Sequence, residues 1–268
     1  MRTQLMKDAL KEGFVPPFPL VDLHGHWGPF SGIYFPKPYG DGMIASMDRS
    51  KVILNVFSSH AALSEGFECN FVTLQAVREY PQRFRGYVVY NPNEPQNWER
   101  CRKLFEKHEE FVGFKIHPGA HNYPLSGKNY QPLFEYAHHS RALVLSHTWA
   151  GDICGTKAVE GIVEKYPEIR FLMGHSCYGE WEGAAQIARD YPHAYLELTA
   201  AYAVGGLVTY FVKQVGSEKM LFGTDAPWFD PYYPMGCIIF ADISDEDRRN
   251  IFYRNAAKLL QIELGEER

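Results

Sequence analysis

The sequence predicts an α/β fold, a single (β/α)₈ TIM barrel that spans residues 1–268 as one domain. Three observations point to this fold. Eight short apolar runs alternate with eight helical patterns, at intervals of about 25 to 35 residues, as a (β/α)₈ barrel requires. The composition, with 46% hydrophobic and 22% charged residues, is that of a globular protein long enough to build such a barrel. A doubly wound sheet, the rival fold, commonly carries a glycine-rich phosphate loop after its first strand, and this sequence has none there.

The first expected strand is the clearest. Leu20, Val21 and Leu23 form a short apolar run between Pro19 and Gly25, a pattern typical of a buried strand. Most of the other seven runs likewise stop at polar residues, proline or glycine. The eight strands are expected within residues 19–27, 51–57, 85–90, 112–117, 142–147, 169–175, 194–199 and 219–225.

Helical patterns follow the strands. They are expected over residues 42–48, 67–80, 96–108, 132–140, 156–166, 181–191, 206–215 and 245–262, and residues 1–13 form a further polar, helix-like segment. The last helix should begin at Ser244, an N-cap residue followed by acidic residues that the helix dipole favours. Long loops rich in aromatic residues remain after the first and eighth strands, and long irregular loops in compact domains are often functional.

The charge and the cysteines exclude several classes of function. A net charge of −5 and a pI near 6.1 provide no basic surface for nucleic acid, so we expect a small-molecule partner. Five scattered cysteines without a Cys-x-x-Cys motif indicate free thiols rather than a disulfide framework. The sequence has no apolar run near the roughly 20 residues that span a bilayer and no signal-peptide core, so we expect a cytoplasmic protein.

Histidines and an aspartate recur at the carboxyl ends of the expected strands, where a barrel places its active site. His24 and His26 are two residues apart on an extended chain, so their side chains share a face with Cα atoms about 6.6 Å apart. Imidazole and carboxylate groups gathered at one rim suit a divalent ion that keeps a position open for water. The candidates at these positions are His24, His26, His60, Asn91, Lys115, His117, His147, His175, Thr199 and Asp225.

Five motifs make the chain resemble the amidohydrolase superfamily, specifically the amidohydrolase-2 branch that includes aminocarboxymuconate-semialdehyde decarboxylase and several lactone and ester hydrolases. They occur in the family's order and span most of the chain. The motifs are Asp22-Leu-His24-Gly-His26, Gly113-Phe-Lys115-Ile-His117-Pro118, Ser146-His147-Thr148, Gly174-His175 and Phe222-Gly-Thr-Asp225-Ala-Pro227.

The resemblance implies that His24, His26, His147 and Asp225 bind one divalent metal ion. Zinc is the expected ion, and manganese, iron, cobalt and nickel are alternatives because the same ligand types accept them. The resemblance further implies that Asp225 and His175 act in catalysis, Asp225 as the base beside a metal-bound water and His175 by orienting that water or stabilising developing charge.

Lys115 and His117 lie on one face of the fourth strand, and both are expected to contact substrate. Lys115 has two interpretations. In binuclear relatives a carbamylated lysine at this place bridges two metal ions, whereas in the mononuclear branch it can bind a substrate carboxylate or a buried acid such as Glu197. The Lys-Ile-His-Pro pattern favours one metal.

The resulting hypothesis is a metal-dependent hydrolase that uses metal-activated water on an ester, lactone or amide of a small molecule. The alternative is a nonoxidative decarboxylase of an aromatic or unsaturated acid, and the absence of a clear substrate-binding arginine in the rim loops argues against it. A non-catalytic barrel that keeps the metal for stability is disfavoured, because structural zinc sites are normally closed. The aromatic residues of the two long loops are expected to form a lid, or else to pack between loops or in a homodimer contact. These residues are Tyr34, Phe35, Trp228, Phe229, Tyr232 and Tyr233.

Overall fold

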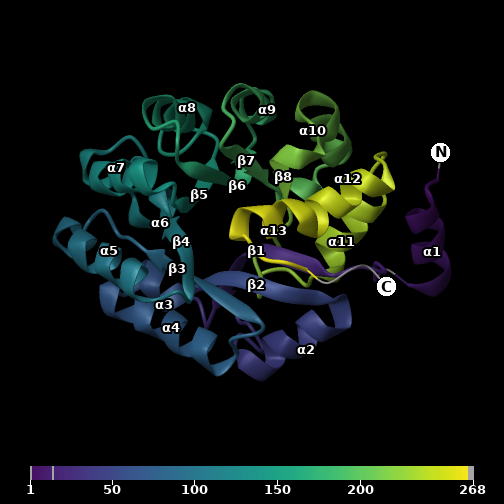
Figure 1. Cartoon of the computed structure of the whole chain (residues 1–268), viewed down its shortest axis with the longest axis horizontal. Coiled ribbons are helices and arrows are strands. Elements are labelled where there is room, and N and C mark those ends of the chain that lie inside the picture. Colours follow the sequence, from purple (N-terminus) through teal and green to yellow (C-terminus); the bar gives the residue numbers. More distant parts are fainter. Residues whose placement is uncertain (1, 14, 265–268) are drawn as a thin grey trace.

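Eight parallel strands lie side by side in chain order and form the central barrel, with helices around the outside (Figure 1). The computed structural model describes residues 2–13 and 15–264 and confirms the predicted (β/α)₈ architecture. The strands are β1 (Leu20–Trp27), β2 (Val52–Ser59), β3 (Phe84–Val89), β4 (Phe111–Ile116), β5 (Leu143–Trp149), β6 (Arg170–Tyr178), β7 (Ala194–Glu197) and β8 (Met220–Leu221).

Most helices lie where the periodicity predicts them. They are α1 (Gln4–Glu12), α2 (Gly40–Ser50), α3 (His60–Ser64), α4 (Asn70–Glu79), α5 (Trp98–Lys107), α6 (Pro118–His121), α7 (Gln131–Ser140), α8 (Thr156–Lys165), α9 (Trp181–Asp190), α10 (Leu207–Val215), α11 (Tyr232–Ile239), α12 (Asp245–Arg249) and α13 (Asn255–Leu260). The segment of α11 was expected as loop, but burial of Met235, Ile238 and Ile239 in the hydrophobic core stabilises a helix there. The last expected helix is divided into α12 and α13 by a π-helical segment, Asn250–Arg254.

The eighth strand is much shorter than residues 219–225, because its end joins β1 through irregular hydrogen bonds. The Leu23 N–H donates to the Phe222 carbonyl over 3.1 Å, and the Asp225 N–H donates to the His24 carbonyl over 2.7 Å. Gly25 and Ala226 form an isolated parallel bridge. These contacts close the barrel, and they bring the backbone of Asp225 next to that of His24.

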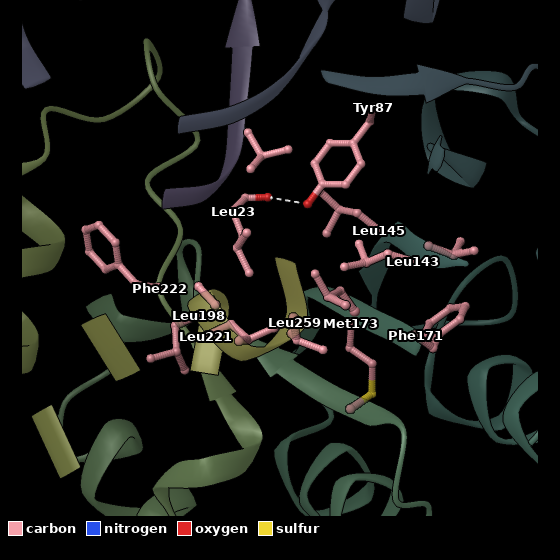
Figure 2. Packing of buried hydrophobic residues seen from close by; sticks show 14 of the residues in the cluster. Leu23, Tyr87, Leu143, Leu145, Phe171, Met173, Leu198, Leu221, Phe222 and Leu259 are labelled. Carbon is pink, nitrogen blue, oxygen red and sulfur yellow. Dashed lines mark hydrogen bonds between the residues drawn. The ribbon is translucent and has the colours of Figure 1, made fainter. Parts of the chain in front are cut away.

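Apolar side chains of the strands and of the surrounding helices form a large buried core, part of which is shown in Figure 2. Tyr87 of β3 is fully buried among them, and its hydroxyl donates a 2.9 Å hydrogen bond to the Leu23 carbonyl of β1. Since β2 separates β1 from β3 in the sheet, this ring reaches across the interior. The packed interior supports the strands whose far ends carry the candidate site.

Three expectations about local chemistry can be compared with the structure. Ser244 caps α12 in a reciprocal capping box with Asp247, which confirms the predicted helix start. All five cysteines are free, as expected. Within residues 2–13 and 15–264, no helix combines the length and apolar character needed to cross a membrane.

Candidate metal centre and active site

The carboxyl ends of the strands surround a cavity of about 290 Å³. Eight of the ten candidates named from the sequence line this cavity, whereas Asn91 and Thr199 do not. The lining consists of His24, His26, Phe30, His60, Leu63, Lys115, His117, Ala120, His147, Trp149, His175, Ala200, Asp225, Trp228 and Phe229. The strand ends therefore bring together residues from the whole length of the chain.

His24, His26 and Asp225 form the tightest cluster in this cavity. One ligand atom of each lies within 4.8 Å of the others. The Asp225 Oδ1 is 3.1 Å from the His26 Nε2 and 3.5 Å from the His24 Nε2. Burial raises the pKa of the Asp225 carboxyl, but His24, His26 and His175 outweigh that effect and hold it well below its usual range. A carboxylate and two imidazoles thus face one another, which is the arrangement that binding of one shared metal ion requires.

Glu197 orients the first of these imidazoles, and the sequence hypotheses did not give it this role. Its Oε2 lies 2.7 Å from the His24 Nδ1 and also accepts the His175 N–H over 3.3 Å. Its Oε1 accepts the N–H and the hydroxyl of Thr199 over 2.7 and 2.6 Å. Because Glu197 takes the Nδ1–H, the lone pair of His24 lies on Nε2, which is 2.7 Å from the Lys115 Nζ and 3.5 Å from the Asp225 Oδ1. The sequence feature that indicates this role is the position of Glu197 between two leucines in a run expected as a buried strand.

Asp22 braces the strands that carry the cluster. Its Oδ1 accepts the backbone N–H groups of His24 and Thr224 over 3.0 and 3.1 Å, and its Oδ2 accepts the Thr224 hydroxyl over 2.5 Å. Burial raises the pKa of Asp22 to about 7, with the Thr224 hydroxyl opposing the shift. Asp22 therefore joins β1 to the segment that leads into Asp225.

His175 enters the cavity through an unusual backbone conformation. His175, Ser176 and Cys177 have φ values of 68°, 51° and 49°, all in the left-handed region. Such conformations cost of order 1–3 kcal/mol each for residues other than glycine and concentrate at functional sites. The His175 Nδ1 is 3.3 Å from the Thr199 carbonyl, to which it can donate, and burial lowers its pKa to about 4. The turn directs a neutral imidazole beside His24, at a ring-centroid distance of 5.1 Å.

His117 and His147 form a stacked pair on another wall of the cavity. Their rings are 3.9 Å apart at 13°, and His147 continues the stack toward the half-exposed ring of Trp149. The His117 Nδ1 accepts the Ala120 N–H over 3.0 Å, so its proton lies on Nε2. His147 is 4.6 Å from His175 between ring centroids and lies outside the three-residue cluster. Its role as a fourth metal ligand stays a prediction.

Lys115 is the cationic side chain of the cavity. It is 1% exposed, and its Nζ lies 2.7 Å from the His24 Nε2. Burial lowers its pKa to about 8, while Asp225 and Glu197 oppose that shift. The two carboxylates favour the ammonium form of Lys115, next to the candidate metal cluster.

The expected aromatic lid is present in part. Trp228 and Phe229, from the loop after β8, line the cavity, and Phe35 packs against Trp228 at 5.1 Å between ring centroids. Tyr34 is 84% exposed and does not line the cavity. The lid is thus built mainly by the loop that follows Asp225.

A divalent metal fits this donor set. Two imidazole nitrogens and one carboxylate oxygen, all buried or nearly so, are ligands that zinc, manganese and related ions accept. The Glu197 contact to His24 is the outer support that metal-binding histidines usually have.

A (β/α)₈ barrel with histidines and an aspartate gathered at its carboxyl rim defines a class of metal-dependent barrel enzymes. The family model described as Amidohydrolase matches residues 21–262. The chain belongs to the amidohydrolase family, as the motifs indicated.

Several relatives are decarboxylases. Gamma-resorcylate decarboxylase of Polaromonas sp. strain JS666 is 23% identical over 273 residues, which cover 82% of this chain and 83% of that protein. The solved dihydroxybenzoic acid decarboxylase of Polaromonas sp. JS666, with bound manganese and 2-nitroresorcinol, has a TM-score of 0.75 and 16% identity and covers 93% of this chain and 99% of its own. The 5-carboxyvanillate decarboxylase of Novosphingobium aromaticivorans, complexed with manganese and 4-hydroxy-3-methoxy-5-nitrobenzoic acid, has a TM-score of 0.73 and 12% identity, with coverages of 91% and 96%. At such identities the structural likeness establishes the fold.

Proposed function

We propose that this enzyme is a metal-dependent, nonoxidative decarboxylase of an aromatic carboxylic acid. The observation that carries the proposal is the buried Lys115 ammonium beside the His24, His26 and Asp225 cluster, in a cavity whose remaining walls are mostly rings. The decarboxylases among the relatives support this alternative over the hydrolysis that sequence reasoning preferred.

The cavity is complementary to a flat acid. Trp228 and Phe229 offer apolar ring surfaces on one side, and the stacked His147 and Trp149 offer them on another. Lys115 supplies the cation that binds a substrate carboxylate. From the sequence, an arginine in the rim loops was expected in this role, and none was evident there. A carboxylated ring would satisfy both kinds of surface at once.

The residues divide the chemistry between them. His24, His26 and Asp225 would hold the ion, with His147 as the predicted fourth ligand; when bound, the ion supplies positive charge that polarises the substrate's oxygen atoms. The bond between the ring carbon and the carboxylate breaks, carbon dioxide leaves, and the electron pair left on the ring carbon takes up one proton, which comes from water. Asp225 and His175 are the groups in the cavity that we assign to this proton transfer.

Hydrolysis of an ester, lactone or amide is the second candidate. Asp225 favours it, because its carboxylate remains 15% exposed toward the cavity and is held in its ionised form by the neighbouring histidines. A base of this kind can accept the proton of a water that attacks a carbonyl.

The deciding experiment compares the two reactions on one preparation. Protein reconstituted with Mn²⁺, the ion present in two of the relatives' structures, is incubated with 2,6-dihydroxybenzoate and 5-carboxyvanillate, and carbon dioxide and the decarboxylated product are quantified. A second panel contains phenyl acetate and a lactone such as dihydrocoumarin. We expect carbon dioxide release that stops when the metal is removed by chelation. Turnover of the second panel without carbon dioxide release from the first would contradict decarboxylation and support hydrolysis.

Lys115→Met tests the recognition of the carboxylate. Loss of a buried hydrogen bond to a charged group costs about 1.5–3 kcal/mol, so we expect kcat/KM for the acid to fall roughly 10- to 100-fold. Steady-state kinetics on the best acid measure the change, and Lys103→Met, at an exposed position of α5, is the matched control. An unchanged kcat/KM in Lys115→Met would show that this lysine does not bind the substrate.

A further inference from the structure

The two histidines of β1 are held in different ways. The His24 ring is fixed by the 2.7 Å contact of its Nδ1 with Glu197. The Nδ1 of His26 has only a 3.5 Å contact with the Ser58 hydroxyl, a long and weak hydrogen bond. Since a metal ligand needs a fixed ring orientation, another contact must restrain His26.

His60, which directly follows β2 as the first residue of α3, provides that contact. Its ring stacks on the His26 ring with centroids 4.5 Å apart and planes 13° apart. Both nitrogens of His60 are already used: Nδ1–H donates to the Gly28 carbonyl over 2.8 Å, and Nε2 accepts the Trp228 indole N–H over 3.0 Å. A ring bound at both nitrogens cannot rotate and offers no lone pair to a metal. Its interaction with His26 is therefore through the ring face.

Trp228 connects this stack to the third ligand. Its backbone N–H donates to the Asp225 carbonyl over 2.7 Å, while its side chain donates to His60. Phe35 of the first long loop stacks parallel to His60, at 5.7 Å and 9°, and packs edge-on against the indole at 5.1 Å. The loops after β1 and β8 thus meet at one buried imidazole next to the candidate metal site.

We propose that His60 and Trp228 are positioning residues for metal binding: the indole-to-imidazole hydrogen bond fixes the His60 ring against His26 and ties the loop that carries Asp225 to the end of β2. The inference rests on the proposed role of His26 and Asp225 as metal ligands. It assigns to Trp228 a specific donor function in addition to the apolar wall that it gives the cavity.

The test measures Mn²⁺ affinity of the metal-stripped, full-length protein by the electron paramagnetic resonance signal of free Mn²⁺. The variants are Trp228→Phe, which removes the N–H donor but keeps a ring, His60→Phe, which keeps a ring face but removes both hydrogen bonds, and the double variant. Trp181→Phe makes the same chemical change on α9, away from the cavity, and is the matched control. Apo-protein melting temperatures show whether each variant is folded.

We expect each single variant to bind Mn²⁺ about tenfold more weakly, as loss of outer support for metal ligands usually does. The double variant should bind no more weakly than His60→Phe, because Trp228 acts through His60, and the control should match the wild type. Affinities within about twofold of the wild type in folded variants, or losses that simply add, would overturn the proposal.

A spectroscopic readout separates positioning from general stability. The indole N–H resonance that disappears in Trp228→Phe identifies Trp228, and we expect this resonance to move upfield in His60→Phe because its acceptor is lost. A resonance that does not move would also overturn the proposal. Neither readout needs turnover, so an absence of decarboxylation would not be confused with failure of this inference.

Discussion

Asp225→Asn is expected to lose its metal and its activity together. The substitution keeps the shape of the side chain but removes the charge that faces His24 and His26 at 3.5 and 3.1 Å. Outer-shell changes already weaken metal binding by 10- to 100-fold, so loss of a ligand charge should weaken Mn²⁺ binding by more than about 100-fold. Metal content per chain, measured on protein purified without added metal, checks the result.

The control for this variant lies in the same loop. Asp230→Asn removes an exposed charge whose Oδ1 accepts the Tyr232 N–H, a bond that asparagine also makes. It should keep the metal content of the wild type. About one equivalent in the wild type, lost only in Asp225→Asn, supports a single-metal centre. Two equivalents would make a carbamylated Lys115 bridge the better interpretation, and retention of the metal in Asp225→Asn would contradict its role as a ligand.

Glu197→Gln should damage both stability and metal binding. Glu197 is fully buried and accepts hydrogen bonds at both oxygens, from the backbone of His175, from Thr199 and from the His24 ring. An amide NH₂ in place of either oxygen would face a donor. Breaking such a buried charged network typically costs 3–5 kcal/mol, so we expect the free energy of unfolding to fall by about 3 kcal/mol. Mn²⁺ binding should weaken roughly 10- to 100-fold, because the orientation of His24 is lost.

Urea denaturation of the apo protein and a Mn²⁺ titration measure the two effects separately. Glu164→Gln, at an exposed position on α8, makes the same chemical change and should leave both unchanged. If Glu197→Gln bound Mn²⁺ with wild-type affinity, orientation of His24 by this carboxylate would not be needed for metal binding.

Local patterns were enough to locate the barrel and much of its rim. Apolar runs that end in polar residues predicted all eight strands. This works because consecutive residues alone show both the buried segment of a strand and the position where it ends. Spacing and position placed His24, His26 and Asp225 among the rim candidates, and the family resemblance implied that they bind the metal. The structure brings these three residues together. The sequence analysis preferred hydrolysis to decarboxylation, whereas the relatives favour decarboxylation.

Elements that depend on distant neighbours could not be predicted in this way. The helix α11 forms in a segment rich in proline and tyrosine because its apolar side chains are buried in the hydrophobic core. Local helix propensity does not include this gain from tertiary packing. The left-handed turn that directs His175 is stabilised by its surroundings rather than by its own residue types.

Local patterns along the chain therefore specify the class of fold, the residue types at the rim and the candidate ligands of the ion. How those ligands are held depends on contacts that exist only in the folded barrel. Glu197 reaches His24 from 173 residues away, and Trp228 reaches His60 from 168 residues away. Such contacts form when the barrel closes and brings the strand ends together. Because the two partners are distant in sequence, no local sequence pattern predicts their contact.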